Sequence, residues 1–419
     1  SIAMYNSTST DNTSNWNLKI PSGSSGTLMV DGRSVITGSI TGEGTLTYFT
    51  PSTDNVLVSD LSAFQGTLQI TTTPTGGNFL VYNQKGYSGA RISLSNNVTM
   101  LYPANETVTI PIGELTGQSK SVLGAGGTGA CLITWEIGAR NTNSTFNGTI
   151  ADTNYKNTGA VAAIRKTGTG ILTLTNANTY SGSTTVTGGE LVVNSISGSG
   201  TGTGDVVVYS DARLSGSGSI AGNITLQDGG ELASVSLNAL RKVRIEPGAF
   251  LSFDIDASTQ TSHQLTVGDT LLMQGILQLN LTGDVSPAAG NEFKLITGAV
   301  RGLPSEVRPA TPGEGLVWDL SAFETEGKVR VSPGTGLKPV FAGMKLHPNP
   351  VQDVLNIRLN QPAPEGRLTV ISLTGARLMV EEFSNTDAMQ LNVSALPAGS
   401  YLIHIQTTDS YFTERIIKH

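Results

Sequence analysis

The chain has 419 residues, and its formal net charge at pH 7 is −7. Charged residues make up only 14% of the sequence and form no Lys/Arg-rich run, which argues against a nucleic-acid partner. One cysteine excludes an internal disulfide, and no apolar run of about 18 residues predicts a membrane-spanning helix.

The N-terminal sequence SIAMYNSTSTDNTSNW (1–16) lacks the apolar segment of a signal peptide. The chain is therefore expected to be either cytoplasmic or a processed or truncated form of a longer protein. The C-terminal sequence, described below, favours the second interpretation.

Residues 30–270 alternate Gly-rich turns with short strands of Val, Ile, Leu and Thr, and no helical pattern of useful length lies between them. More than 300 residues are too many for one sandwich or barrel. The pattern therefore predicts an all-β fold in which residues 1–332 form a right-handed parallel β-helix, a solenoid with aliphatic side chains inside. An aromatic-x-Gly motif recurs at irregular spacing, starting at Phe64, Tyr87, Phe146 and Tyr180.

The clearest repeat unit is KTGTGILTLTNANTYSGSTTVTGGELVVN (166–194), with strands expected at 171–174, 184–187 and 191–193. Asn176 and Asn178 are interpreted as turn residues that tolerate left-handed backbone angles. This unit resembles the passenger-associated repeats of autotransporter-like β-helix proteins of bacteria. The resemblance implies a surface-located β-helix and says little about activity.

Candidates for chemistry are few. Asp254 and Asp256 lie on one face of a predicted strand and are interpreted as solvent-exposed surface residues. The alternative is that they bind Ca²⁺ or act in acid–base catalysis. The G-x-G-x-x-G match within 124–130 is interpreted as a turn, because a strand rather than a helix follows it. None of the four histidines has an acid or cysteine at ligand spacing. We therefore predict no catalytic residue, cofactor or metal site, and a buried, inert Cys131.

Residues 333–344, PGTGLKPVFAGM, have the composition of a linker. The following residues 345–419 alternate in short strands with turns at 364–366, 373–376 and 397–399. We read seven strands there, which predict a small Ig-like β-sandwich.

This last segment carries several motifs in order: Pro348-Asn349-Pro350, Leu373-Thr374-Gly375, then LPAGSY (396–401), and a terminal strand that ends at Lys418. They resemble the C-terminal sorting domain of type IX secretion cargo in Bacteroidetes. The resemblance implies that the sorting signal includes these residues: Pro348, Asn349, Pro350, Gly375, Leu396, Gly399, Tyr401 and Lys418.

The resemblance further implies export through the periplasm to the cell surface or medium. The implied partners are the type IX outer-membrane translocon, its cargo shuttle and a surface sortase, with lipopolysaccharide as a candidate anchor. The solenoid is then expected to be a structural or adhesin-like passenger with a glycan as its candidate ligand. The alternatives are a polysaccharide lyase or glycoside hydrolase on a β-helix, or the non-catalytic end of a longer secreted enzyme.

Overall fold

The computed structural model describes residues 2–4, 12–30, 34–51, 55–57, 59–81, 85–103, 106–126, 129–152, 159–234, 236–283, 285–334, 338–339, 345–372, 376–407 and 410–419. The chain forms two compact units, Ser1–Gly313 with Trp318–Ser332, and Glu314–Val317 with Pro333–His419. We name residues 1–334 the solenoid and residues 338–419 the terminal domain.

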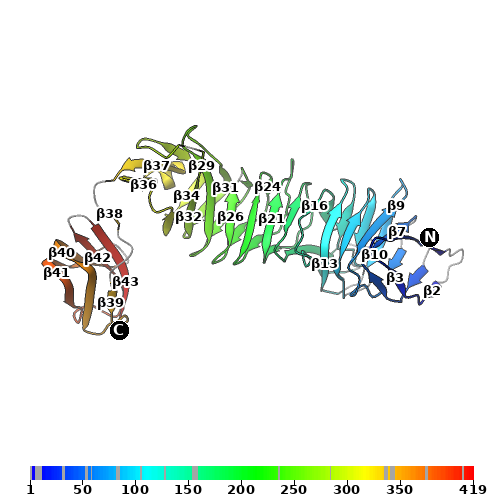
Figure 1. The fold of residues 1–419 in the computed structure, drawn as a ribbon, viewed down its shortest axis with the longest axis horizontal. Coiled ribbons are helices and arrows are strands. Elements are labelled where there is room, and N and C mark those ends of the chain that lie inside the picture. The colour runs from blue at the N-terminus through cyan, green and yellow to red at the C-terminus, as the bar shows by residue number, and fades with distance from the viewer. Residues whose placement is uncertain are drawn as a thin grey trace. The chain divides into compact units, whose positions relative to one another are not determined.

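The solenoid consists of strands that stack on their counterparts one coil away (Figure 1). The largest sheet contains β1 (Ile2–Met4), β4 (Ser25–Val30), β7 (Thr45–Thr50), β9 (Thr67–Thr72), β11 (Tyr87–Leu94), β13 (Val108–Gly117), β15 (Leu132–Ile137), β16 (Ser144–Phe146), β18 (Val161–Lys166), β19 (Ile171–Leu174), β20 (Thr184–Val186), β21 (Gly189–Val193), β22 (Val206–Val208), β23 (Ala212–Gly216), β24 (Ser219–Ile220), β25 (Ile224–Leu226), β26 (Glu231–Ser234), β27 (Asn238–Ala239), β28 (Val243–Ile245), β29 (Phe250–Asp256), β30 (Thr261–Ser262), β31 (Leu265–Met273), β32 (Ile276–Thr282), β34 (Ile296–Arg301) and β35 (Glu306–Arg308).

Smaller sheets complete the coils. One contains β2 (Asn12–Ser14), β5 (Ser34–Ile36), β8 (Asn55–Leu57), β10 (Gly77–Val81), β12 (Val98–Leu101), β14 (Val122–Gly124) and β17 (Thr149–Ala151), and another pairs β3 (Leu18–Ile20) with β6 (Ile40–Gly42). At the far end lie β33 (Glu292–Lys294), β36 (Leu316–Asp319), the short helix α1 (Phe323–Glu326) and β37 (Lys328–Pro333).

The register of the strands gives the length of each coil. Val206 of β22 pairs in parallel with Ile224 of β25, eighteen residues further along the chain. Leu132 of β15 pairs in parallel with Val161 of β18, twenty-nine residues further. Parallel pairing at one coil's separation confirms the predicted β-solenoid, and the unequal coil lengths explain why the sequence repeat is irregular.

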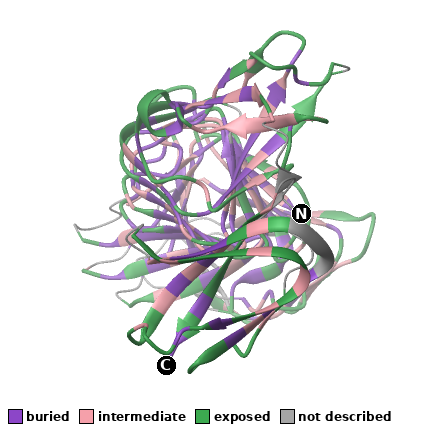
Figure 2. Cartoon of the chain, turned by 90° about the vertical axis from the view of Figure 1, so that its left-hand side faces the viewer, coloured by how far each residue is buried: buried purple, intermediate pink, exposed green. Residues whose placement is uncertain are grey.

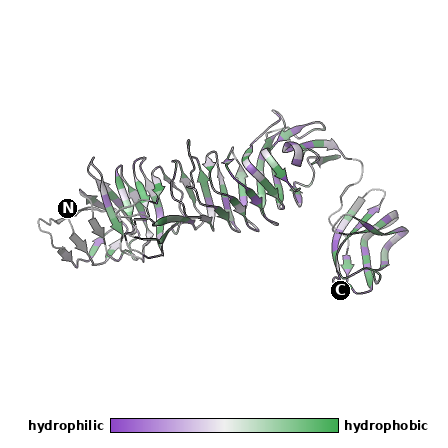
Figure 3. Ribbon diagram, turned by 180° about the vertical axis from the view of Figure 1, so that it is seen from behind, coloured by the Kyte–Doolittle hydropathy of each residue, from purple (hydrophilic) through white to green (hydrophobic). Residues whose placement is uncertain are grey.

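A column of leucines shows how the sequence pattern builds the core. Alternation along each strand places every second side chain inside, and parallel register stacks these side chains from coil to coil. Each leucine in the column is at most 1% exposed and contributes about 2 kcal/mol through burial. Hydrophobic and hydrophilic residues accordingly alternate along the solenoid strands (Figure 3). The column consists of Leu172, Leu191, Leu214, Leu232, Leu251 and Leu277.

The recurring aromatic-x-Gly motif is a core element. Phe64, Tyr87, Phe146 and Tyr180 are all fully buried. The glycine of the motif allows a close approach between coils: a Cβ on Gly148 would lie 2.5 Å from the Ser121 carbonyl oxygen and 2.6 Å from Cζ of Phe146. The motif therefore specifies coil packing rather than a ligand site.

Asn176 and Asn178 lie between strands β19 and β20, as predicted, but the expectation of left-handed backbone angles is wrong, since neither residue is among those with positive φ. Asn178 instead is buried and joins three coils through its side chain. Its Oδ1 accepts a hydrogen bond from the Ile150 amide at 2.7 Å, and its Nδ2 donates to the Gly200 carbonyl at 2.5 Å. Asparagine is needed here because one side chain must both accept and donate.

Parallel stacking stops after β35. At this end β33 pairs antiparallel with β37, and one side chain from each of β33, α1 and β37 is buried: Phe293, Phe323 and Val329. In the described residues, no helix combines the length and hydropathy needed to cross a membrane.

The terminal domain contains β38 (Lys338–Pro339), β39 (Lys345–His347), β40 (Val354–Ser372), β41 (Arg377–Asn392), β42 (Gly399–Thr407) and β43 (Ser410–Lys418). Apart from β38, the strands pair antiparallel. Buried residues alternate with less buried ones along β42, whereas Leu391 is the single buried residue of β41, so these strands carry both buried and exposed positions (Figure 2). They enclose one core, formed by Val351, Leu355, Ile357, Leu359, Leu368, Val370, Leu391, Val393, Tyr401, Ile403, Ile405 and Ile416.

The strand count differs from the prediction of seven. The second and third expected strands are continuous in β40, and the fourth and fifth are continuous in β41. The pairing of β40 with β41 continues on both sides of a register shift between Arg358 and Ala363. The turn residues at 364–366 therefore lie within a strand, which explains why a count based on turn signals is too high.

Strand structure also occurs at the first residue and in the middle of the predicted linker. Strand β37 extends through Pro333, and β38 pairs with Ser410 and Tyr411 of β43. The other linker residues, 335–337 and 340–344, lie outside the described part of the chain.

Candidate functional site

The predicted sorting residues at the start of the terminal domain contact its last strand. The Asn349 Nδ2 donates to the Arg415 carbonyl at 2.9 Å, and its Oδ1 accepts from the Ile417 amide at 2.9 Å. The side-chain amide thereby pairs with β43 much as a neighbouring strand would. Pro348 and Pro350 on either side are exposed, and each follows a cis peptide bond.

Immediately after this motif, Val351 continues the contact. Its amide donates to the Ile417 carbonyl at 2.8 Å, and its carbonyl accepts from the His419 amide at 3.0 Å, so Val351 and Lys418 form a β-bridge. On the opposite side of β43, Lys418 pairs with Gly399 of β42. Lys418 is therefore the point at which two of the sequence motifs meet.

The remaining predicted residues lie nearby or support this arrangement. The Tyr401 hydroxyl donates to the Pro397 carbonyl at 2.8 Å and holds the turn that precedes β42. Leu396 packs against the core, whereas Gly399 is exposed. Gly375 lies outside the described residues.

The weak metal candidates Asp254 and Asp256 do share one face of β29, as predicted, but each has another partner. Asp256 accepts hydrogen bonds from the Ser258 amide and hydroxyl at 2.8 and 2.6 Å, which lower the pKa of its carboxyl. Asp254 lies 3.5 Å from Nδ1 of His263, and its Oδ1 accepts from Asn280. Within the described ranges, no group of three or more His, Cys, Asp or Glu side chains could hold a metal ion.

Cys131 is 7% exposed, in agreement with the prediction of a buried thiol, and burial raises its pKa. A raised pKa keeps the thiol protonated near neutral pH and therefore a poor nucleophile. The glycine-rich segment before it leads into strand β15, so a helix N-terminus of the kind that binds dinucleotides is not formed there.

Two buried charges stabilise coil packing. The Glu114 side chain is 4% exposed and accepts from Nε of Arg91 at 2.6 Å, from its Nη2 at 3.1 Å, and from the Thr142 hydroxyl at 2.7 Å. The ammonium of Lys166, a residue that is 1% exposed, donates to the carbonyls of Thr167, Gly168 and Gly188. These direct hydrogen bonds offset the desolvation cost of burying both charges, so we assign both groups a structural role.

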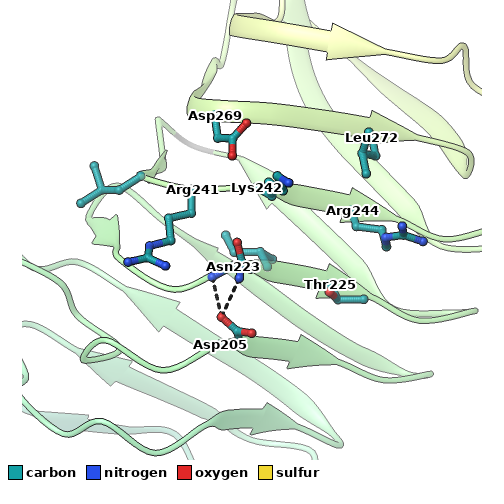
Figure 4. Close-up of a pocket in the computed structure, with 10 residues that line it drawn as sticks. Asp205, Asn223, Thr225, Arg241, Lys242, Arg244, Asp269 and Leu272 are labelled. Carbon is teal, nitrogen blue, oxygen red and sulfur yellow. Dashed lines mark hydrogen bonds between the residues drawn. The ribbon is translucent and has the colours of Figure 1, made fainter.

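Pocket geometry reveals a groove that sequence reasoning missed (Figure 4). It is open to solvent, has a volume of about 680 Å³, and crosses four successive coils at β22, β25, β28 and β31. Its lining is Asp205, Asn223, Ile224, Thr225, Leu240, Arg241, Lys242, Arg244, Asp269 and Leu272. We name this feature the coil groove.

The coil groove combines free positive charge with carboxylates. Arg244 pairs with Glu246 at 3.0 Å, whereas Arg241 and Lys242 form no salt bridge with any residue that the structure describes. Oδ1 of Asp205 accepts from the amide and the side chain of Asn223 at 2.9 and 3.0 Å. Leu240, 48% exposed, adds an apolar edge. The residues come from four coils, so no local sequence motif could have signalled them.

Two families match parts of the chain. Residues 345–419 match the secretion system C-terminal sorting domain, and residues 164–193 match the passenger-associated-transport-repeat. Both matches confirm the resemblances predicted from motifs. The terminal domain is a secretion sorting domain, and the solenoid carries an autotransporter-associated repeat.

The chain is also similar to the Adhesin BmaC autotransporter of Brucella suis biovar 1 (strain 1330), with 30% identity over 230 residues. The alignment covers 51% of this chain but only 6% of that relative's length. The match to a secretion sorting domain and the similarity to this adhesin together indicate a secreted or surface protein.

Proposed function

We propose that this chain is an adhesin-like β-solenoid passenger that the type IX secretion system of a Bacteroidetes bacterium exports across the outer membrane. The observation that carries the proposal is a matched sorting domain at residues 345–419 in the same chain as a parallel solenoid with a passenger-associated repeat. The similarity to an adhesin supports the adhesin-like role.

In this proposal the outer-membrane translocon recognises the folded terminal domain. Recognition involves the surface around Lys418, where Pro348, Asn349 and Pro350 meet the last strand. A cargo shuttle and a surface sortase act afterwards, and lipopolysaccharide is the candidate anchor. A pre-formed domain suits this task, because its contact surface needs no ordering when the partner binds.

The solenoid would act as an extended support that presents its surface to other cells or to glycans. Stacked coils give a long surface from local contacts alone, which is how repeat proteins build large binding faces. Outward Thr, Ser and Asn side chains keep such a surface soluble at low charge.

Deletion of residues 345–419 tests the export step. The truncated chain should accumulate in the periplasm, whereas the full chain reaches the surface or the medium, as followed by cell fractionation and protease accessibility of intact cells. The intact mass of the exported protein would show whether the terminal domain is removed and what is attached. Surface display of the truncated chain at the level of the full chain would contradict the proposal.

A further inference from the structure

We infer that the coil groove is a binding site for a polysaccharide that carries isolated carboxylates, such as a uronic-acid polymer. This inference deepens the proposed adhesin-like function and rests on it for exposure of the groove outside the cell.

The coil groove presents unpaired positive charge. Arg241 and Lys242 are consecutive, exposed and without a salt-bridge partner among the described residues, although the chain as a whole carries −7. In contrast, many of the other basic groups of the solenoid are paired, as Arg213 is with Glu190 and Glu231. The two free cations are therefore available for a carboxylate, which a guanidinium can bind through two hydrogen bonds.

Polar and apolar side chains line the coil groove around these cations. Oδ2 of Asp205 accepts no hydrogen bond from the described residues, because the contacts from Asn223 go to Oδ1. That free oxygen can accept from a sugar hydroxyl. Leu240 and Leu272 supply apolar surface for the C–H side of a sugar ring, and Thr225 adds a hydroxyl. Pockets that bind ligands combine such apolar surface with a few directed polar groups.

The coil groove is long enough for several sugar units. Consecutive coils are separated by the strand spacing of about 4.8 Å, so lining residues from four coils extend over about 14 Å. The groove is open to solvent, so an extended polymer segment can lie across it and contact residues of all four coils. An extended polymer segment therefore fits this shape better than a small compact ligand.

Charge distribution distinguishes such a polysaccharide from nucleic acid. Double-stranded DNA presents one negative charge per roughly 1.7 Å. Asp205 and Asp269 in the lining would repel so dense a row of phosphates, and Arg244 is already paired with Glu246. A polymer with isolated carboxylates between hydroxyls avoids this repulsion and uses the same Asp side chains as acceptors.

The experiment measures binding of the purified full chain to immobilised polygalacturonate, to neutral pullulan and to double-stranded DNA at about 50 mM salt. We expect measurable binding to polygalacturonate, weaker binding to the other two polymers, and a decline at higher salt, because exposed charge pairs are screened. The double variant Arg241→Gln/Lys242→Gln should bind polygalacturonate about tenfold more weakly.

A matched control removes the same charge elsewhere. Lys19 and Lys120 are exposed solenoid residues outside the coil groove, so Lys19→Gln/Lys120→Gln should stay within about twofold of the unchanged chain. Circular dichroism and thermal unfolding would establish that all variants remain folded.

The inference is overturned if the unchanged chain does not bind polygalacturonate, if pullulan or DNA binds as tightly, or if the groove variant and the control variant bind alike. Purified protein reports on the groove independently of export. If the chain without residues 345–419 still reached the surface, the sorting proposal would be contradicted, but the measured binding of polygalacturonate to the coil groove would be unaffected.

Discussion

Lys166 shows how one buried charge can join neighbouring turns. Its ammonium donates to the Thr167, Gly168 and Gly188 carbonyls at 2.7, 3.2 and 3.0 Å, and Gly188 belongs to the next coil. Replacement by methionine keeps the stem but leaves three carbonyls without this donor. We expect Lys166→Met to lower the free energy of unfolding by about 3 kcal/mol. Chemical denaturation would measure the change, with the exposed Lys120→Met as control.

The same residue should give the solenoid a pH dependence. Burial lowers the pKa of Lys166 from 10.5 to about 8, and the Glu190 carboxylate partly opposes this shift. Between pH 8 and 10.5 the unfolded chain therefore holds more protons than the folded chain, so stability rises with pH across that window.

Across this window the lowered pKa should increase the free energy of unfolding by about 3 kcal/mol. The stability difference between the unchanged chain and Lys166→Met should accordingly increase from pH 7 to pH 10. A difference that stays constant over this range would contradict the lowered pKa.

In the terminal domain, the single residue Asn349 contributes to stability. Its amide joins Arg415 and Ile417, so Asn349→Ala removes two hydrogen bonds to β43. We expect the domain to lose about 1 to 2 kcal/mol of stability. Export of this variant should also decrease if the translocon recognises the folded surface of the domain. Thermal unfolding and surface display would measure the two effects. The control Gln390→Ala removes an exposed amide that bonds only to Asn356 among the described residues.

At the scale of elements, coil stacking depends on glycine where two backbones approach. Gly148 shows no positive φ, so the constraint is space: an added Cβ would lie 2.3 Å from the Ser121 hydroxyl and 2.5 Å from its carbonyl oxygen. Gly148→Ala should therefore destabilise the solenoid by about 2 kcal/mol through overpacking.

Gly26 provides the matched control, because a Cβ there would meet only Cδ1 of Ile20 at 3.6 Å. Gly26→Ala should unfold at nearly the temperature of the unchanged chain. Equal unfolding temperatures for the two glycine variants would show that the close approach at Gly148 does not limit coil packing.

At the scale of the whole molecule, the two units have separate cores. The terminal domain encloses its own cluster of buried side chains, and its first strand, β38, pairs with β43. We expect fragments 1–334 and 338–419 each to fold alone, because each unit buries its apolar residues internally. Differential scanning calorimetry of the fragments should reproduce the transitions of the full chain. A marked shift in either transition would indicate stabilising contact between the units.

The sequence by itself determined the fold class, the position of the terminal domain and its identity as a sorting domain. These features depend on local patterns: alternation along strands, glycine-rich turns and motifs within a few residues, such as Pro348-Asn349-Pro350. The recurrence of Phe64, Tyr87, Phe146 and Tyr180 before a glycine is also visible in the sequence, whereas their burial is a finding of the structure.

Only the tertiary structure decided which residues of different coils meet. Coil length varies from eighteen residues between Val206 and Ile224 to thirty-one between Leu265 and Ile296, since turns accept insertions while strands keep their register. The coil groove, the Lys166 contacts and the bridge through Asn349 all join residues far apart in sequence. The pairing of such residues depends on the summed lengths of the intervening turns, which no local pattern of amino acids reveals.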